Sequence, residues 1–362
     1  MIKENMESRQ IVFLIVMFIF GSSIIMGINT DVAQDSWIAI VIAIFLSLPL
    51  GLMYARIVKL NPGDSLFDIA EKLFGKVIGK VINIFITWYA FHLGTMVLCN
   101  FVKYIELSSL LNTPEVLVAA LMVLVAVYIV KSSITTLGKW SAIILPIVML
   151  IVLLTVIMAA SSLDVNNILP LMSHSPDRIL KGSMNILAFP LAETMLILCL
   201  ACFFKKEDSP YKIYMGGLLI GGGFLLAVFL RNLLVLGAPM ISNIFFPSYV
   251  AARIIEFGDF ITRMEGVITI NFVLAGITKI AVCLLAASKG MTKLFNTKNY
   301  KDLVLPSALI ILAMSTFLYN SVLEMFDFIK IYSIYAFPFQ IIIPLIIWIA
   351  SERRAKKERV AS

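Results

Sequence analysis

The sequence contains little charge and few residues that could carry out acid–base or metal chemistry. Only 14% of its 362 residues are charged, whereas about a quarter are charged in an ordinary soluble domain. Histidine occurs twice, and the motifs G-x-S-x-G, H-E-x-x-H and G-x-x-x-x-G-K-[ST] do not occur. The sequence therefore excludes a water-soluble fold, and we expect no enzyme, no catalytic residues, no cofactor, no metal and no ATP-driven pump.

Cysteine is scarce as well. Cys99, Cys199, Cys202 and Cys283 lie inside apolar blocks, without the spacing of a disulfide framework or a zinc finger. Cys199 and Cys202 form a C-x-x-C with no histidine nearby, so we interpret them as packing residues. The net charge of +7 resides in short connectors that lack interleaved aromatic residues, so we expect no nucleic-acid partner.

Long apolar blocks dominate the sequence instead. Hydrophobic residues make up 60% of the chain, and blocks of about 20 residues are long enough to cross a bilayer as helices. We predict an all-α integral membrane protein, surrounded by lipid, that forms a single transmembrane domain over residues 1–362. The ten predicted transmembrane helices lie near 10–30, 36–58, 78–102, 114–131, 140–160, 183–204, 212–237, 265–288, 303–320 and 334–351.

These spans form two sets of five. The first repeat covers about 10–160 and the second about 183–351, with a polar connector between them and a basic tail at 352–362. Connectors on the side of the two termini contain 21 lysines and arginines, whereas those on the opposite side contain 6. The positive-inside rule therefore predicts that both termini, and the basic tail, are cytoplasmic.

Two connectors have the periodicity of amphipathic helices. Apolar residues of 66–74 recur at helical spacing opposite three charged side chains, which predicts a helix on the inner membrane surface. Segment 247–263 repeats the pattern on the outer side. That segment is expected to cap a site from outside.

The first span of each set is interrupted. Gly21-Ser22-Ser23 weakens the first helix, and Ala188-Phe189-Pro190 breaks the sixth because proline lacks an amide hydrogen. Matched interruptions predict a five-plus-five inverted repeat with broken helices 1 and 6 and a binding site at the membrane midplane. The alternative is that glycine and proline merely kink both helices, as they often do in membranes.

Two ionisable residues lie deep within predicted spans, where a charge is costly and is usually paired or faces a cavity. For Lys279, one hypothesis is that its ammonium replaces a bound sodium ion beside the first break; the other is a structural ion pair with Glu193 or another carboxylate. Arg231 is expected to snorkel toward the outer surface rather than to bind an anion. His92, beside Tyr89, is interpreted as packing more readily than as a ligand contact.

The predicted pocket suits a small molecule with a carboxylate, because the amino ends of half-helices attract anions. In span seven, Gly217 and Gly221 form a G-x-x-x-G, which favours close helix packing instead. The candidate ligand-binding residues are Gly21, Ser22, Ser23, Tyr89, Ala188, Phe189, Pro190 and Glu193, with Lys279 as cation substitute or ion-pair partner.

Several short motifs along the chain are typical of one family of bacterial membrane proteins. They are Asp35-Ser36-Trp37, Pro62-Gly63-Asp64-Ser65-Leu66-Phe67-Asp68-Ile69 with Phe74-Gly75-Lys76, Phe189-Pro190 with Glu193, Ile255-Glu256-Phe257-Gly258-Asp259-Phe260 with Arg263 and Glu265, and Tyr300-Lys301-Asp302-Leu303 with Pro306. Through these motifs the chain resembles the spore germination protein family, and more closely the B subunit of germinant receptors.

This resemblance implies a member of the amino acid, polyamine and organocation transporter superfamily in the spore inner membrane. It implies a sensor of small germinants, typically amino acids, sugars or nucleosides, that works beside an A subunit and a C lipoprotein. We expect an amino acid germinant first. The main alternative is a secondary amino acid transporter coupled to protons or sodium, because one fold can host both functions. The third hypothesis is a structural or channel-forming subunit without its own ligand.

Overall fold

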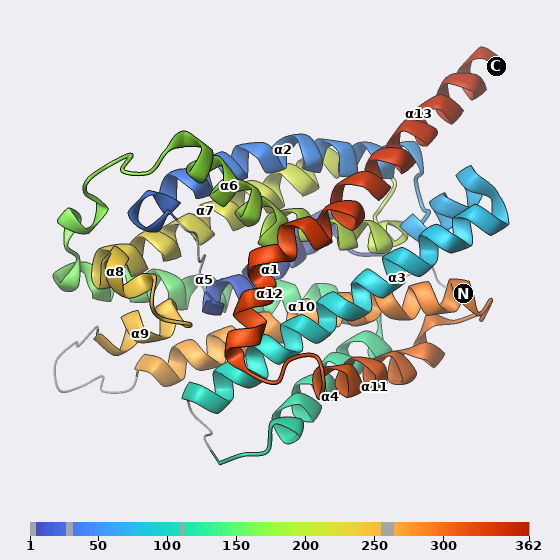
Figure 1. The fold of residues 1–362 in the computed structure, drawn as a ribbon. Helices are drawn as coiled ribbons and strands as arrows, with labels where there is room; N and C mark the ends of the chain where they lie inside the picture. Colours follow the sequence, from blue (N-terminus) through green and yellow to red (C-terminus); the bar gives the residue numbers. More distant parts are fainter. Residues whose placement is uncertain (1–4, 27–31, 109–111, 255–263, 362) are drawn as a thin grey trace.

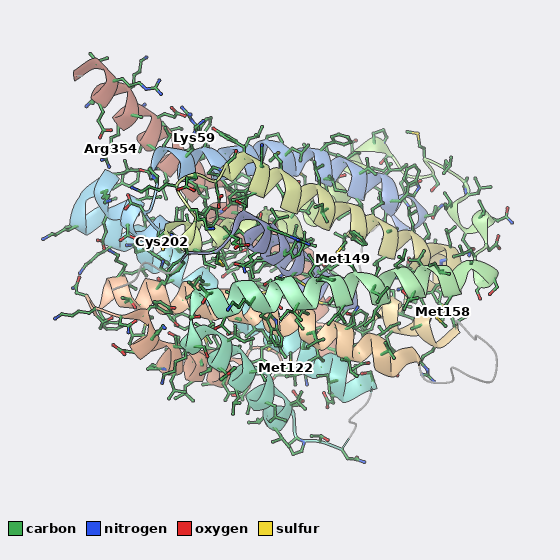
Figure 2. The ribbon with its side chains drawn as sticks, turned by 180° about the vertical axis from the view of Figure 1, so that it is seen from behind. Lys59, Met122, Met149, Met158, Cys202 and Arg354 are labelled. Atoms are coloured by element: carbon green, nitrogen blue, oxygen red, sulfur yellow. The ribbon has the colours of Figure 1, made fainter. Side chains whose placement is uncertain are left out.

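The chain folds into a bundle of long helices. The computed structural model describes residues 5–26, 32–108, 112–254 and 264–361. Both termini lie at the same end of the bundle (Figure 1). We call this the terminal end and the opposite one the far end. Figure 2 shows Lys59, Cys202 and Arg354 at the terminal end and Met158 at the far end.

The first five spans are continuous helices apart from one break in α1. A surface helix precedes the third span, as predicted: Ser65 caps its start by accepting from the Asp68 amide at 3.3 Å, and Gly75, at φ 78°, turns the chain before the span. The elements are α1 (Ser8–Met26), α2 (Ser36–Leu60), α3 (Leu66–Ser108, which includes the surface helix), α4 (Glu115–Ser132) and α5 (Ile134–Met158).

The second half is less regular. A π-helical segment, η4 (Leu187–Leu191), separates α6 (Pro176–Ile186) from the 3₁₀ helix η5 (Ala192–Phe203). A second π segment, η7 (Pro338–Ile342), joins α12 to α13. The remaining α-helices are α7 (Pro210–Leu236), α8 (Ala238–Ile241), α9 (Pro247–Ile254), α10 (Met264–Leu294), α11 (Val304–Ser315), α12 (Val322–Phe337) and α13 (Ile343–Ala361). Short 3₁₀ helices are η1 (Ala33–Asp35), η2 (Ala159–Ser162), η3 (Val165–Ile168) and η6 (Tyr300–Leu303).

Within the described residues, nine helical stretches are long and apolar enough to cross a membrane, and α11 is a tenth, shorter apolar helix. Large apolar side chains such as Phe45, Leu124 and Ile143 are more than half exposed on the outside of the bundle, as expected for residues that face lipid. The chain is therefore a multi-pass membrane protein.

Several boundaries differ from the sequence prediction by five residues or more, including the starts of α5 and α6 and the ends of α3 and α10. The ninth helix ends at Ser315 rather than near 320, and the last span begins at Val322 rather than near 334. Glu324, Asp327 and Lys330 fall within 322–334, so the charged first turns of this helix resemble a connector in the sequence. The basic tail is also helical to Ala361 and extends from the bundle as the end of α13 (Figure 1).

Close packing of α7 against α1 follows the predicted G-x-x-x-G. A Cβ added at Gly217 would meet Ile15, and one added at Gly221 would meet Ile19.

The expectation that Arg231 snorkels is wrong. Its side chain is 4% exposed and donates to Thr155 Oγ1 at 2.7 Å and to Asn232 Oδ1. The helix can bury it because neighbouring polar side chains accept its hydrogen bonds.

The predicted outer amphipathic segment is helical over α9, Pro247–Ile254, and residues 255–263 lie outside the described part of the chain.

Both predicted breaks are present. In α1 the backbone of Gly21 is not helical, with φ −1° and ψ −109°. In the sixth span the same is true of Phe189, with φ −130° and ψ 111°. Helices 1 and 6 are thus interrupted at corresponding points of the two repeats.

Gly21 provides a test of how tightly the first break is packed. A Cβ at this position would overlap the side chain of Lys279, whereas a Cβ at Gly223 meets nothing within 4 Å. We expect Gly21→Ala to lower the free energy of unfolding by about 1–3 kcal/mol because of overpacking. Gly223→Ala should leave it unchanged or slightly raise it. Thermal unfolding of the two purified variants measures these changes. Equal stabilities of Gly21→Ala and Gly223→Ala would contradict the close packing of Lys279 against Gly21.

Candidate functional site

The site is built around Lys279, which projects from the middle of α10 into the break of α1. Its side chain is fully buried, and the absence of a side chain at Gly21 leaves room for it. The ammonium Nζ lies 2.5 Å from Oε2 of Glu193, on η5, and 3.5 Å from Oγ of Ser22. One lysine therefore contacts both interrupted helices.

Two aromatic rings complete the surroundings of the ammonium. Lys279 Nζ lies 5.1 Å from the ring centroid of Phe18, in α1, and 5.1 Å from that of Phe189, in the break of the sixth span. At this distance a cation is attracted to the ring face. The charge is thus held by one carboxylate, one hydroxyl and two aromatic rings, drawn from both broken helices.

A chain of buried hydroxyl groups continues from the other carboxylate oxygen. Tyr332, on α12, donates to Glu193 Oε1 at 2.7 Å, and its hydroxyl lies 3.0 Å from that of Tyr89, on α3. Gln340, in η7, donates to the Tyr89 hydroxyl at 2.8 Å. The network therefore joins α3, η5, α10, α12 and η7. A change at the ion pair would alter hydrogen bonds that involve all of these elements.

Gln340 also binds the exposed backbone of the sixth-span break. Its side-chain Nε2 donates to the backbone carbonyl of Ala188 at 2.8 Å, while its backbone carbonyl accepts from the hydroxyl of Tyr54, on α2, at 2.7 Å. An interrupted helix leaves carbonyls without helical partners, which must be satisfied when they are buried. The side-chain amide of Gln340 fulfils that requirement for Ala188, and the hydroxyl of Tyr54 fulfils it for the carbonyl of Gln340 in η7.

A cavity of about 340 Å³ adjoins the network between the sixth span and α12. Ala188, Ala192 and Gln340 form its inner wall, and the other lining residues are mostly apolar, including Leu187 and Phe337. Small-molecule pockets commonly combine an apolar lining with a few convergent polar groups. The cavity therefore offers space for an apolar group next to the break.

The structure brings most of the predicted site residues together. Gly21, Ser22, Phe189 and Glu193 all lie against the side chain of Lys279. The other predicted residues take part less directly. Tyr89 reaches Glu193 through Tyr332, Ala188 offers its carbonyl, Pro190 is buried in the π segment, and Ser23 donates to the Ile19 carbonyl of its own helix.

Three members of the network were missed in the sequence. Tyr332 lay in what was read as a connector, because the last span was predicted to begin too late. Gln340 is an isolated amide in an apolar span, which is a signal that could have been used. Tyr54 gave none. His92, in contrast, packs among rings, with its centroid 4.9 Å from that of Tyr335, although its Nδ1 has no hydrogen-bond partner among the described residues.

The buried ion pair yields a direct energetic prediction. Removing one partner leaves the other charge unpaired, which costs about 3–5 kcal/mol. We expect Lys279→Met alone, or Glu193→Gln alone, to lower the free energy of unfolding by that amount. In the double variant the loss should be smaller than the sum of the two single losses by at least half of one of them. Lys330→Met, which removes a surface pair with Asp327, should cost less than about 1 kcal/mol.

The measurement is a double-mutant cycle on unfolding free energies of the purified protein. Strictly additive losses from the two single substitutions would contradict a direct interaction between Lys279 and Glu193. If Lys330→Met lowered the free energy of unfolding as much as Lys279→Met does, the cost of removing one partner would not depend on burial of the pair.

Comparison with solved structures places the chain in a known architecture. The transporter MhsT, solved in complex with L-phenylalanine, superposes with a TM-score of 0.68 over 95% of this chain and 89% of its own, at 12% identity. Mhp1, a nucleobase-cation-symport-1 family transporter with bromovinylhydantoin bound, gives a TM-score of 0.69 over 94% and 78%, at 13% identity. The fold is therefore the five-plus-five inverted repeat of these transporters.

Sequence comparison identifies the family. Spore germination protein KB of Bacillus subtilis (strain 168) is 22% identical over 98% of this chain and 96% of its own length. Spore germination protein XB of Bacillus anthracis is 22% identical over 64% of each chain. The model of the family described as "Spore germination protein" matches residues 5–324. The chain belongs to the spore germination protein family.

Proposed function

We propose that this chain is the germinant-sensing membrane subunit of a spore germination receptor, and that it has no catalytic activity. In this proposal a small germinant, an amino acid in the first instance, binds at the midplane beside the two breaks. The observation that carries the proposal is the contact of Lys279 with both broken helices through Glu193 and Ser22. A ligand that alters this contact changes the relation between the two repeats.

The chemistry of an amino acid matches that of the pair. Its carboxylate competes with Glu193 for the ammonium of Lys279 and can accept from the hydroxyl of Ser22, and its own ammonium competes with Lys279 for Glu193. An apolar side chain would occupy the cavity beside Ala188 and Ala192. A ligand that binds one conformer better than the other shifts the population toward it.

The ion pair also accounts for a sensor that needs no coupled cation. In transporters of this architecture, cations bind among the carbonyls of broken helices. We propose that the ammonium of Lys279 takes the place of such a cation and locks the break of α1. Because a tethered cation cannot leave, the closed state would not depend on a sodium gradient.

The signal must pass to other subunits, and the family likeness supports a germinant receptor A subunit and a C lipoprotein as those partners. We place the chain in the spore inner membrane, with both termini cytoplasmic, because 21 connector lysines and arginines lie on the side of the termini. Tyr332 lies on α12, which continues through η7 into the extended α13 (Figure 1). That path leads from the site toward the terminal end.

The second candidate is a secondary amino acid transporter coupled to protons or sodium. It is favoured by the likeness to MhsT, solved with L-phenylalanine, and to Mhp1. The two candidates make opposite predictions about accumulation of substrate. A sensor saturates with bound ligand, whereas a transporter fills a vesicle when a gradient is applied.

We expect the purified protein to bind one or a few of the twenty amino acids with saturation, detected as an increase in its melting temperature. Liposomes that contain the protein should not accumulate the same radiolabelled amino acid under a sodium or proton gradient. Accumulation driven by either gradient would favour the transporter.

Ser22 tests the position of the ligand. We expect Ser22→Ala to weaken binding of that amino acid about tenfold, because it removes a hydrogen bond to a charged group. Ser141→Ala is the matched control, since Ser141 is equally buried but donates only to the Leu137 carbonyl of its own helix. Equal affinities of the two variants would place the ligand elsewhere.

A further inference from the structure

A second cavity lies at the far end of the bundle, apart from the network around Lys279. It has a volume of about 310 Å³ and lies between the end of α3, the start of α4 and the segment that leads from α11 to α12. Unlike the cavity beside Gln340, it is lined by charged side chains, Lys103 and Glu115. Nothing in the proposed function uses it.

The single lysine of this cavity is bound by two carboxylates, one in the lining and one beside it. Lys103, whose side chain is 12% exposed, donates to Glu115 Oε1 at 2.6 Å and to Glu106 Oε2 at 3.4 Å. An ammonium has three protons to donate, so one remains for a further acceptor. Two carboxylates face one lysine, which leaves one negative charge without a counterpart in this group. The site can therefore accept both an anionic and a cationic group.

An independent feature is the hydroxyl of Tyr319, which also lines the cavity. Tyr319 is 9% exposed, and its hydroxyl has no hydrogen-bond partner among the described residues. A buried hydroxyl without a partner is costly, and a bound molecule would satisfy it. Nearby, Ser315 and Thr316 donate to carbonyls of their own helix at 2.7 and 2.8 Å, which leaves their oxygens as acceptors.

We propose that this cavity is a second binding site, and that its ligand is zwitterionic. The anionic group of the ligand accepts from Lys103 and Tyr319, while its ammonium binds Glu115. Two sources provide this chemistry: a free amino acid, and the headgroup of phosphatidylethanolamine, whose phosphate and ammonium are close together. The start of α4 is exposed, with Val116 52% exposed, and the cavity lies at the far end of the bundle, so a lipid headgroup and a dissolved amino acid can both reach it.

A ligand here would touch α3, which belongs to the central network, and the segment that leads into α12, without entering the network. Lys103 lies on α3, the helix that carries Tyr89, and Tyr319 lies just before α12, the helix that carries Tyr332. Occupancy would therefore restrain α3 relative to α12. The proposal does not depend on the identity of the ligand at the midplane.

The experiment measures alkylation of a cysteine placed in the wall of the cavity. Val116→Cys is labelled with N-ethylmaleimide in vesicles of phosphatidylglycerol, and labelling is located by peptide mass spectrometry. L-alanine, tested with the other amino acids, is the free probe, and added phosphatidylethanolamine is the lipid probe. We expect one of them to slow labelling at least fivefold. Val165→Cys, whose parent side chain is 71% exposed, should be unaffected.

Further variants assign the protection to this cavity. Tyr319→Phe and Lys103→Met should each abolish it, whereas Tyr128→Phe, which removes a hydroxyl from the outside of α4, should not. Ser22→Ala should retain the protection, which separates this site from the one at the midplane. The proposal is overturned if neither probe slows labelling, or if the protection persists in both Tyr319→Phe and Lys103→Met.

Discussion

The buried pair of Lys279 and Glu193 is the interaction on which the rest of the site depends. Two opposite charges with no exposed surface can lie in the middle of a membrane protein only if each satisfies the other. Here the pair also fixes the two places where the helices are interrupted. Gly21 is needed because the lysine passes through the space of its side chain, and Glu193 is held by Tyr332 on its other oxygen.

The second constraint is the backbone that the breaks expose. Polar backbone atoms at membrane depth require partners, and water is scarce there. The carbonyl of Ala188 is satisfied by Gln340, which is itself held by Tyr54 and Tyr89. Because the same side chains satisfy the backbone and extend the ion-pair network, a change at the pair must also change the break. This coupling is what a sensor or a transporter requires.

Much of this arrangement could be predicted from the sequence, for identifiable reasons. The spans follow from apolar length, and the breaks follow from Gly21-Ser22-Ser23, which weakens a helix, and from Pro190, which cannot continue one. Lys279 and Glu193 stood out because charge is rare inside spans. The partners Tyr332 and Gln340 could not be assigned to a network, since their contacts depend on how α12 packs against the sixth span. Arg231 was misjudged because its neutral partners, Thr155 and Asn232, give no signal in a sequence.

The central claim is that the Lys279–Glu193 pair locks both broken helices, and hydrogen–deuterium exchange tests it most directly. Backbone amides exchange when a segment opens locally, so their rates report the stability of each break. In Lys279→Met, we expect the peptides that cover residues 19–26 and 187–194 to exchange at least tenfold faster than in the unsubstituted protein, while a peptide within α4 is unchanged. Unchanged exchange at both breaks would contradict the account.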